Sequence, residues 1–445
     1  MKVERYGFAL VLLFAGVFLK PLHAEETKSF SMKVDLSNHL LFRNDSDFDR
    51  SAPYYNPDGQ SVGIAGTLLK PQLTWNVNEN LKIYYEFELG LNIWSKNNPD
   101  LIDPVSENTF LLKHREVWAE GWLPGRYPFT FGFKAGYRRF ISPTGLFINH
   151  WIGAASIMSG DRDNVEVSLS AGLIPDQTYE GIVYGENNFS HDTVLLSATA
   201  FAKLYKEFDL TIGFLYLIDN RIVDKQNTIF CLETHLDLRY DKFDFYLDAA
   251  VQYGNYDNAA ADGSWMSHLA FGLQGGGNLT AGDLKLKANL LLLSPDDDQQ
   301  YNKKNGGFYY SGKSRSSTLF LSEDENRDWY DNIDEKIAYT EGAFFVTRAG
   351  LFVADVKAEY DFGIFEPALI VGAAFVLNKK NALNNSFAGF ETDADLKFVA
   401  GDYLEFHLIG GLLIPGGAAS AHMNGIDRYA KDAVYSIESH LVVRY

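Results

Sequence analysis

Two carboxylates, Glu86 and Glu88, stand two residues apart in the stretch LKIYYEFELGLNIW, residues 81–94. In a β-strand both side chains would lie on one face, about 7 Å apart. Glycosidases use two carboxylates at such separations, one as general acid and one as base or nucleophile, but they place them across a substrate cleft. An enzyme using this pair is therefore the third and least favoured interpretation, and we expect no catalytic residues.

Other patterns that could support chemistry fail in their context. The glycine-rich stretch 272–277 has no helix after it, which a phosphate-binding loop requires, so it predicts a bulge or a close strand contact. No Gly-x-Ser-x-Gly elbow occurs. The acidic groups at 296–298 and 323–328 do not match the twelve-residue calcium loop, and solvated loops explain them better. We expect no metal and no cofactor, and Cys231 as an inert strand residue.

The first 24 residues have the layout of a secretory signal peptide. Lys2 and Arg5 precede the apolar run FALVLLFAGVFL, and Ala24 is the small residue at the expected cleavage position. Cleavage after Ala24 would leave one domain, 25–445, outside the cytoplasm. No later stretch approaches the roughly 18 uninterrupted apolar residues that a membrane-spanning helix needs.

The composition narrows the class further. Aromatic residues make up 15% of the chain, with 25 Tyr and 33 Phe, although the mean hydropathy is only −0.15. Many aromatics in a chain that is not hydrophobic on average are typical of alternating strands with aromatic girdles. The formal charge of −19 argues against a nucleic-acid partner, which would need a basic face.

The stretch 81–94 alternates between apolar and polar residues with a period of two, which predicts a strand with one apolar face. The same rule predicts about eighteen strands along the chain. They cover 31–43, 61–78, 80–94, 109–123, 128–141, 151–159, 164–173, 193–205, 208–219, 228–240, 242–253, 265–279, 282–294, 341–361, 363–377, 387–400, 402–413 and 432–445.

The predicted links alternate in length. Short links such as 206–207 and 281–282 follow even-numbered strands, whereas 44–60, 95–108, 174–192 and 295–340 follow odd-numbered strands. Transmembrane barrels have this pattern, with tight periplasmic turns on one rim and long external loops on the other. An even number of strands would leave both termini periplasmic.

A soluble β-protein is the competing interpretation, but eighteen apolar faces are too many for one soluble core. A closed barrel uses all of them, because its outside meets lipid and its backbone groups are all paired. The last strand alternates up to Tyr445, and a terminal aromatic residue resembles the insertion signal of bacterial outer-membrane barrels. We therefore predict an all-β fold, a transmembrane antiparallel up-and-down β-barrel in the bacterial outer membrane, with lipids around it.

The polar faces would then line an interior of porin size. Ionisable groups cannot face hydrocarbon, so they must face water or one another. The candidates for pore lining from this alternation are Lys82, Glu86, Glu88, Lys134, Arg138, Lys203, Lys285 and Lys287. Paired charges on a solvated wall explain most of these positions equally well. The strand 109–123 is ambiguous, because its charged residues occur on both faces.

The segment 295–340 departs from a plain barrel. It is long and has no clear periodicity, but aromatic residues such as Phe308 and Trp329 give it apolar anchors. We expect it to be external or to fold into the pore mouth as a constriction, with Lys313, Arg315 and Arg327 beside acidic groups.

Two stretches are similar to the alginate-export type of outer-membrane barrel. They are KHREVWAEGWLPGRYPFTFGFKAGYRRFISPTGLFINHWIGA, residues 113–154, and SGKSRSSTLFLSEDENRDWYD, residues 311–331. The resemblance implies an eighteen-stranded channel through which acidic exopolysaccharide leaves the cell, without a cofactor. It also implies that Arg115, Lys134, Arg138 and Arg139 belong to a basic pore lining.

These observations predict an outer-membrane channel for a polar solute or an acidic exopolysaccharide, with a general or sugar-type solute porin as the second interpretation. The lumen charges are nearly balanced, so ion selectivity does not follow from them. The solute, the direction of transport and the oligomeric state stay open.

Overall fold

The computed structural model describes fourteen stretches of the chain. They are 29–43, 62–90, 111–123, 130–161, 164–174, 193–219, 227–256, 265–296, 304–311, 314–319, 321, 350–382, 384–419 and 432–444. The predicted signal peptide, the acidic stretch 323–328 and Tyr445 lie outside these residues. None of the helices in the described stretches is long and apolar enough to cross a membrane.

Nearly all of the described chain is β-strand, because period-two alternation runs through almost every stretch. The strands are β1 (Ser29–Arg43), β2 (Val62–Asn78), β3 (Leu81–Gly90), β4 (Leu111–Leu123), β5 (Thr130–Ile141), β6 (Asn149–Asp161), β7 (Val165–Ile174), β8 (Thr193–Tyr205), β9 (Phe208–Asp219), β10 (Asn227–Tyr240), β11 (Phe243–Tyr256), β12 (Met266–Ala281), β13 (Leu284–Leu293), β14 (Lys304–Asn305), β15 (Leu351–Tyr360), β16 (Phe365–Val376), β17 (Phe387–Ala400), β18 (Leu404–Pro415) and β19 (Val434–Arg444). A short 3-10 helix, η3 (Lys379–Ala382), lies between β16 and β17.

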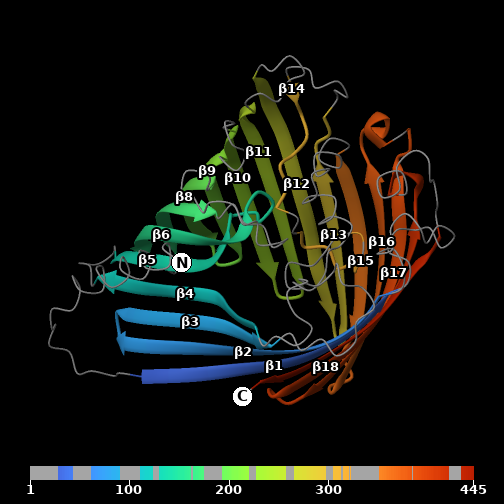
Figure 1. The fold of residues 1–445 in the computed structure, drawn as a ribbon, viewed down its shortest axis with the longest axis horizontal. Helices are drawn as coiled ribbons and strands as arrows, with labels where there is room; N and C mark the ends of the chain where they lie inside the picture. The colour runs from blue at the N-terminus through green and yellow to red at the C-terminus, as the bar shows by residue number, and fades with distance from the viewer. Residues whose placement is uncertain are drawn as a thin grey trace.

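The strands form one closed antiparallel barrel (Figure 1). Closure is made by β1, in which Asp35 pairs with Lys70 of β2 on one side and with Arg444 of β19 on the other. β13 pairs directly with β15, so the two-residue β14 is not part of the barrel wall; it lies parallel to β12. The barrel therefore has eighteen strands within the described residues, and the predicted fold class is confirmed.

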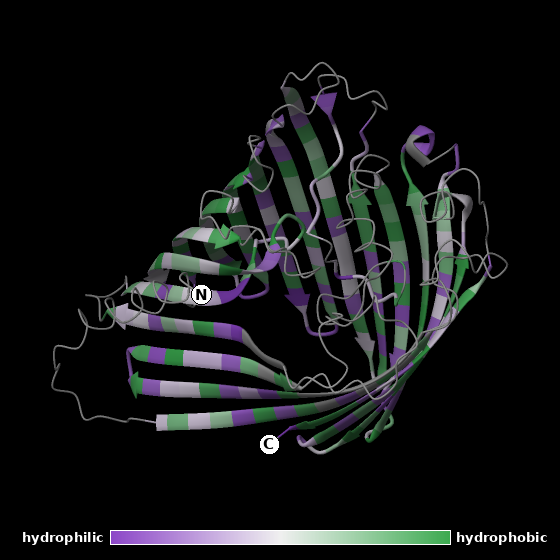
Figure 2. Cartoon of the chain, viewed as in Figure 1, coloured by the Kyte–Doolittle hydropathy of each residue, from purple (hydrophilic) through white to green (hydrophobic). Residues whose placement is uncertain are grey.

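Alternate residues of each strand face opposite sides of the wall. On β11, Tyr246, Asp248 and Gln252 are buried, whereas Val251 and Tyr253 between and beside them are half-exposed or more. Figure 2 shows the resulting bands of hydrophilic and hydrophobic residues across the strands. The apolar face lies on the outside, as a transmembrane barrel requires.

The strand bounds preserve the alternation of link lengths. Two residues join β8 to β9, β10 to β11 and β12 to β13, whereas 44–61, 91–110 and 294–350 separate other neighbours. We call the rim that carries these longer links the long-link rim. Of the strand predicted at 341–361, the structure describes β15 from Leu351, and residues 341–349 lie outside the described part of the chain.

The ambiguous strand 109–123 contains a β-bulge. Glu86 of β3 pairs with Glu116 of β4, but the next residue, Phe87, pairs with His114, which leaves Arg115 as an extra residue. An inserted residue shifts the phase of the alternation. Strict period-two reading therefore could not place the charged residues of β4 on one face.

Gly136 of β5 occupies a position that only glycine tolerates. Its φ is +140°, and a Cβ there would lie 2.1 Å from the carbonyl oxygen of Val117. We expect Gly136→Ala to lower the free energy of unfolding by about 2–4 kcal/mol, measured by urea titration in detergent micelles. Gly153→Ala on β6 is the control, because a Cβ there meets nothing within 4 Å. Equal unfolding midpoints for the two variants would contradict this reasoning.

Candidate functional site

A segment of the long link between β13 and β15 lies inside the barrel. We call residues 304–321 the inserted segment; the structure describes 304–311, 314–319 and 321 of it. Phe308 and Thr318 are fully buried, and Leu321 is 3% exposed. Such burial in a link is possible only if its backbone donors and acceptors find partners on the wall.

Carboxylates on the inner wall provide many of those partners. Asp355 of β15 accepts hydrogen bonds from the backbone N–H of Ser317 (3.1 Å) and from the hydroxyl of Ser316 (2.9 Å). Glu391 of β17 accepts from the backbone N–H groups of Leu321 (2.8 Å) and Leu319. Hydrogen bonds to ionised acceptors are stronger than neutral ones. The acidic wall therefore fastens the inserted segment through its backbone.

Side-chain amides continue the attachment towards β11. Gln252 donates to the carbonyl oxygen of Tyr309 and accepts from its N–H, both at 2.8 Å, as a neighbouring strand would. Gln274 accepts from the backbone N–H of Arg315 (2.9 Å) and donates to Asp248 (3.1 Å). Both amides are fully or almost fully buried, so their polar atoms are used inside the barrel.

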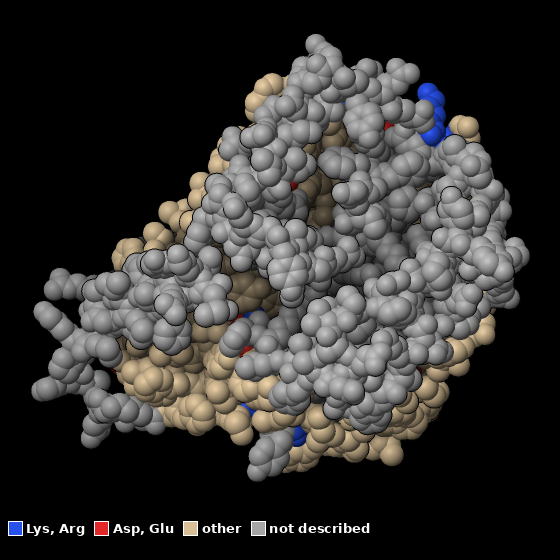
Figure 3. Space-filling view, in the orientation of Figure 1, with Lys and Arg blue, Asp and Glu red and all other residues tan. Residues whose placement is uncertain are grey.

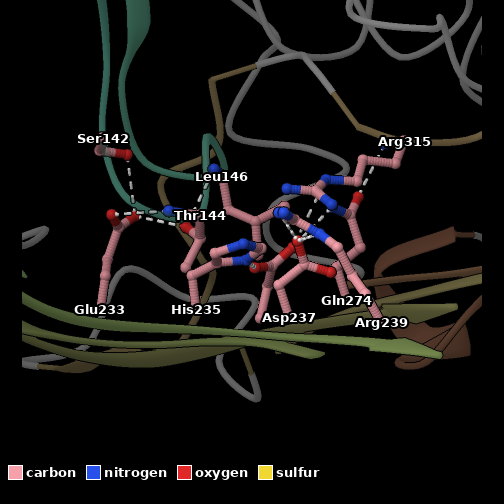
Figure 4. A network of polar contacts seen from close by, with 10 residues as sticks. Ser142, Thr144, Leu146, Glu233, His235, Asp237, Arg239, Gln274 and Arg315 are labelled. Carbon is pink, nitrogen blue, oxygen red and sulfur yellow. Dashed lines mark hydrogen bonds and ion pairs between the residues drawn. The ribbon is translucent and has the colours of Figure 1, made fainter. Parts of the chain in front are cut away.

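A second element enters from the link between β5 and β6. This turn, residues 142–148, is held by Glu233 of β10, which is 0% exposed. Glu233 accepts from the hydroxyls of Ser142 (3.0 Å) and Thr144 (2.6 Å) and from the N–H groups of Thr144 and Phe147 (both 3.3 Å). Figure 4 shows Glu233 reaching from the sheet to the turn.

The inserted segment and the turn 142–148 contact each other. The N–H of Ser311 donates to the carbonyl oxygen of Leu146 (2.8 Å), and the hydroxyl of Ser311 donates to the carbonyl oxygen of Gly145 (2.7 Å). The rings of Phe147 and Tyr309 meet edge to face, with centroids 5.8 Å apart. Two links that are remote in sequence therefore form one body inside the barrel.

A cation of the inserted segment stands beside a buried acid. The Nε atom of Arg315 lies 3.9 Å from Asp248, and its guanidinium carbon lies 4.4 Å from the ring centre of Tyr246. The other oxygen of Asp248 lies 2.6 Å from Nδ1 of His235. Figure 4 shows Arg315 and Gln274 converging above the sheet that carries His235.

The wall of β3, β4 and β5 has a different composition. The ring of Trp118 is stacked on Tyr84 at 4.9 Å and lies below the ammonium groups of Lys134 (3.8 Å) and Lys82 (5.1 Å). Trp118 is 6% exposed, because these three side chains cover it. A cation over an aromatic face is attracted by the ring quadrupole, so Trp118 fixes the position of both lysines.

The acids of this wall accept hydrogen bonds from aromatic side chains two residues away. Glu86 accepts from the hydroxyl of Tyr84 (2.5 Å), and Glu116 accepts from the indole N–H of Trp118 (2.7 Å). Glu120 lies 3.9 Å from Lys134. Cations and carboxylates thus alternate along this wall, and Glu86 has a structural role that does not require catalysis.

The other predicted pore-lining residues are spread around the barrel. Arg138 faces inward and donates to Ser156 (2.8 Å). Lys203 pairs with Asp209 near the short-link end of β8, and Lys285 forms an ion pair with Glu359 (3.1 Å). Lys287 pairs across the sheet with Lys357 of β15. Glu88 belongs to β3, but its side chain lies outside the described part of the chain.

Arg115 and Arg139 do not join this group. Arg139 pairs with Trp151, whereas its neighbour Arg138 pairs with Ile152, which is fully buried inside the barrel. Adjacent residues of a strand face opposite sides, so Arg139 and Trp151 lie on the outer face. The guanidinium of Arg115 lies over the same Trp151 ring (4.8 Å). A basic pore lining would need both arginines on the inner face, whereas their guanidinium groups lie beside Trp151 on the outer face.

Sequence reasoning missed the residues that hold the inserted segment. Asp248, Gln252, Gln274, Asn289 and Asp355 are buried and hydrogen-bonded, but none was a candidate. The available signal was the occurrence of polar residues, Asp248, Gln252 and Gln274, among the inward positions of β11 and β12. Within the described residues, no group of three His, Cys, Asp or Glu side chains has the geometry to hold a metal ion.

The closed eighteen-strand barrel with an apolar outer face has the fold of the bacterial outer-membrane porins. OccK9 (OpdG) of Pseudomonas aeruginosa is similar over 94% of this chain and 98% of its own, with 12% identity and a TM-score of 0.56. The BenF-like porin of Pseudomonas fluorescens gives 11% identity, coverage of 94% and 99%, and a TM-score of 0.56.

OccK8 (OprE) of Pseudomonas aeruginosa is similar at 12% identity, with coverage of 93% and 98% and a TM-score of 0.52. No family model and no curated protein sequence matches the chain. At these identities the similarity shows the fold alone. It supports an outer-membrane porin barrel, and not the narrower alginate-export family suggested by residues 113–154 and 311–331.

Proposed function

We propose that the protein is a porin through which small polar solutes diffuse across the outer membrane. The observation that carries this proposal is the inserted segment, which the carboxylates of Asp355 and Glu391 fasten inside the barrel. A barrel of eighteen strands has a wide bore unless links fill it. The inserted segment and the turn 142–148 narrow that bore without belonging to its wall.

Seen in the orientation of Figure 1, described residues form tan surface deep within the outline of the molecule (Figure 3). A bore that is narrowed by fastened links suits small solutes better than a polymer. The solute porin is therefore favoured over the exporter of acidic exopolysaccharide, and the three named porin structures are consistent with this choice.

Charges of both signs on the β3–β5 wall favour polar solutes without a strong preference for one ion. Lys82, Lys134 and Arg138 alternate with Glu86, Glu116 and Glu120 on inward positions. Close charges of opposite sign cancel much of each other's field at a distance. Uncharged and zwitterionic solutes find donors and acceptors there. The proposed channel has its long-link rim outside the cell and both termini in the periplasm.

Liposome swelling tests the proposed function. Liposomes containing the purified protein should swell in solutions of pentoses and hexoses, and the rate should fall steeply for disaccharides and trisaccharides. Protein-free liposomes are the control. If no sugar enters, and if oligouronates block the ion conductance of the protein in planar bilayers, the exporter is the better interpretation. Absence of both permeation and conductance would reject a channel.

The lysine over Trp118 provides a selectivity test. Lys134→Gln removes one positive charge from the alternating wall, and we expect the ratio of cation to anion permeability to rise about twofold. The reversal potential in a salt gradient across a planar bilayer measures this ratio. Lys242→Gln is the matched control, because Lys242 lies exposed in the turn between β10 and β11. The same shift in both variants would show that the wall charge does not act locally.

A further inference from the structure

A histidine of the inner wall lies between the barrel and the inserted segment. His235 of β10 is the ladder partner of Asp248 of β11, and the Nδ1 atom of His235 lies 2.6 Å from an oxygen of Asp248. Asp248 is fully buried, whereas 16% of the His235 side chain is exposed. Within the described residues, the other ring nitrogen, Nε2, has no hydrogen-bond partner. A proton from the lumen can therefore reach Nε2 while Nδ1 stays bonded to the acid.

The second oxygen of Asp248 faces the inserted segment. It accepts a hydrogen bond from the side-chain amide of Gln274 (3.1 Å), and it lies 3.9 Å from the Nε atom of Arg315. That distance is too long for a hydrogen bond, so the attraction depends on the net charge of the acid and its neighbours. The Arg315 side chain is 30% exposed, and Asp248 is the one carboxylate of the described residues within 4.0 Å of its nitrogen atoms.

The other ionisable groups around His235 have partners of their own. They are Glu233, Asp237 and Arg239 on β10, Asp209 on β9, and Asp244 and Tyr246 on β11 (Figure 4 shows those on β10). Glu233 accepts hydrogen bonds from the turn 142–148, which has no ionisable side chain, and Asp237 accepts from Arg239. Asp209 and Asp244 lie beside the same arginine, towards the short-link end of the strands. The hydroxyl of Tyr246 donates to Asn289 (2.8 Å). Asp248 is therefore the acid that a proton on His235 affects most directly.

We propose that His235, Asp248 and Arg315 form a pH-sensitive latch, which controls whether the Arg315 side chain stays on the wall or extends into the lumen. When His235 is neutral, it donates its Nδ1–H to Asp248, and the charge of Asp248 attracts Arg315. When the pH falls, Nε2 binds a proton, and the imidazolium balances that charge. Arg315 then faces a second cation across one acid, and its side chain leaves the acid for water. Histidine is the side chain whose charge ordinarily changes between pH 5 and 8.

Opening the latch changes the charge of the lumen more than its width. The backbone N–H of Arg315 stays bonded to Gln274 (2.9 Å), so the inserted segment keeps its place. The lumen gains the charge of His235, and the charge of Arg315 moves away from its acid. Both changes favour anions over cations, because positive charges attract the first and repel the second. The inference rests on the proposed function, since it assigns a regulation to that channel.

Reversal potentials across planar bilayers, measured in a KCl gradient between pH 8 and pH 5, test the latch. We expect the ratio of anion to cation permeability of wild type to rise about threefold as the pH falls. His235→Gln does not gain the charge and should lose most of this rise. Asp248→Asn removes one negative charge and releases Arg315 at every pH, so its ratio at the higher pH should be near the wild-type ratio at the lower pH. His407→Gln is the matched control and should keep the rise, because the ring of His407 also bonds to inward carboxylates of the wall.

Modification of Arg315 by phenylglyoxal at neutral pH, measured by peptide mass spectrometry of the full chain in detergent, tests the same latch without conduction. His235→Lys places a cation beside Asp248, and Arg315 should then react about threefold faster than in wild type. His407→Lys should leave the rate at Arg315 unchanged. An equal pH-dependent rise in wild type and His235→Gln, or equal rates at Arg315 in wild type and His235→Lys, would overturn the latch. A protein that conducts at no pH contradicts the porin proposal, and the modification rates then decide on the latch alone.

Discussion

Replacing residues 304–321 by a short Gly-Ser linker is expected to raise the single-channel conductance in planar bilayers about twofold or more, because an eighteen-stranded barrel without an internal segment has a much wider bore. The inserted segment is fastened by wall acceptors, and its one strand, β14, pairs along β12 without interrupting the ladder between β13 and β15. The wall should therefore close without it. Larger sugars should also enter liposomes that contain the deletion variant.

The control replaces η3 (Lys379–Ala382) by the same linker. This element is also part of a link, but Lys379 and Lys380 are exposed. The conductance of that variant should equal the wild-type value. A deletion of 304–321 that folds and leaves the conductance unchanged would show that the inserted segment does not limit the path, and would count against the proposed constriction.

The second large effect is expected at Glu233, whose carboxylate accepts hydrogen bonds from four donors of the turn 142–148. Glu233→Ala leaves buried donors of Ser142, Thr144 and Phe147 without an acceptor, and each such donor costs about 1–3 kcal/mol. We expect the turn 142–148 to move away from β10, because this exposes the unsatisfied donors to water and avoids part of their burial cost. The variant should therefore lose about 3 kcal/mol of unfolding free energy, measured by urea titration in detergent, and show noisier open-channel current.

Asp237→Ala is the matched control on the same strand. Asp237 pairs with Arg239, whose side chain is 61% exposed, and exposed ion pairs contribute at most about 1 kcal/mol. Glu233→Gln should fall between the two, because it keeps one acceptor oxygen. If Glu233→Ala and Asp237→Ala have the same free energy of unfolding and the same open-channel current noise, the carboxylate of Glu233 does not hold the turn.

The wall of the barrel follows from local sequence. A period of two is a property of neighbouring residues, so β10 and β11 could be predicted within a few residues of their observed ends. The strand 109–123 was ambiguous because a bulge depends on how two strands fit together, and Arg115 gives no local sign of it.

The candidate site followed the sequence less well. Alternation predicted Lys82, Lys134 and Arg138 as pore-lining residues; they share the face of the buried Trp118 and Ile152, and their role in the pore stays a prediction. Arg139 was taken from a family resemblance and lies on the opposite face. The inserted segment could be recognised as unusual, but its attachment could not. Its hydrogen bonds join residues as remote as Gly145 and Ser311, and a backbone N–H that binds a distant carboxylate leaves no pattern in the sequence.

The pairing of β1 with β19 has a consequence for assembly. Asp35 and Arg444 are ladder partners, so the first and last strands, β1 and β19, must pair before the backbone groups of both strand edges are hydrogen-bonded. Until then, both ends expose an unpaired row of amides and carbonyls, which invites pairing with another chain. A chain truncated before Val434 would lack β19 and would keep two unpaired strand edges. We expect it to aggregate or be degraded, and not to insert into the bilayer as a smaller barrel.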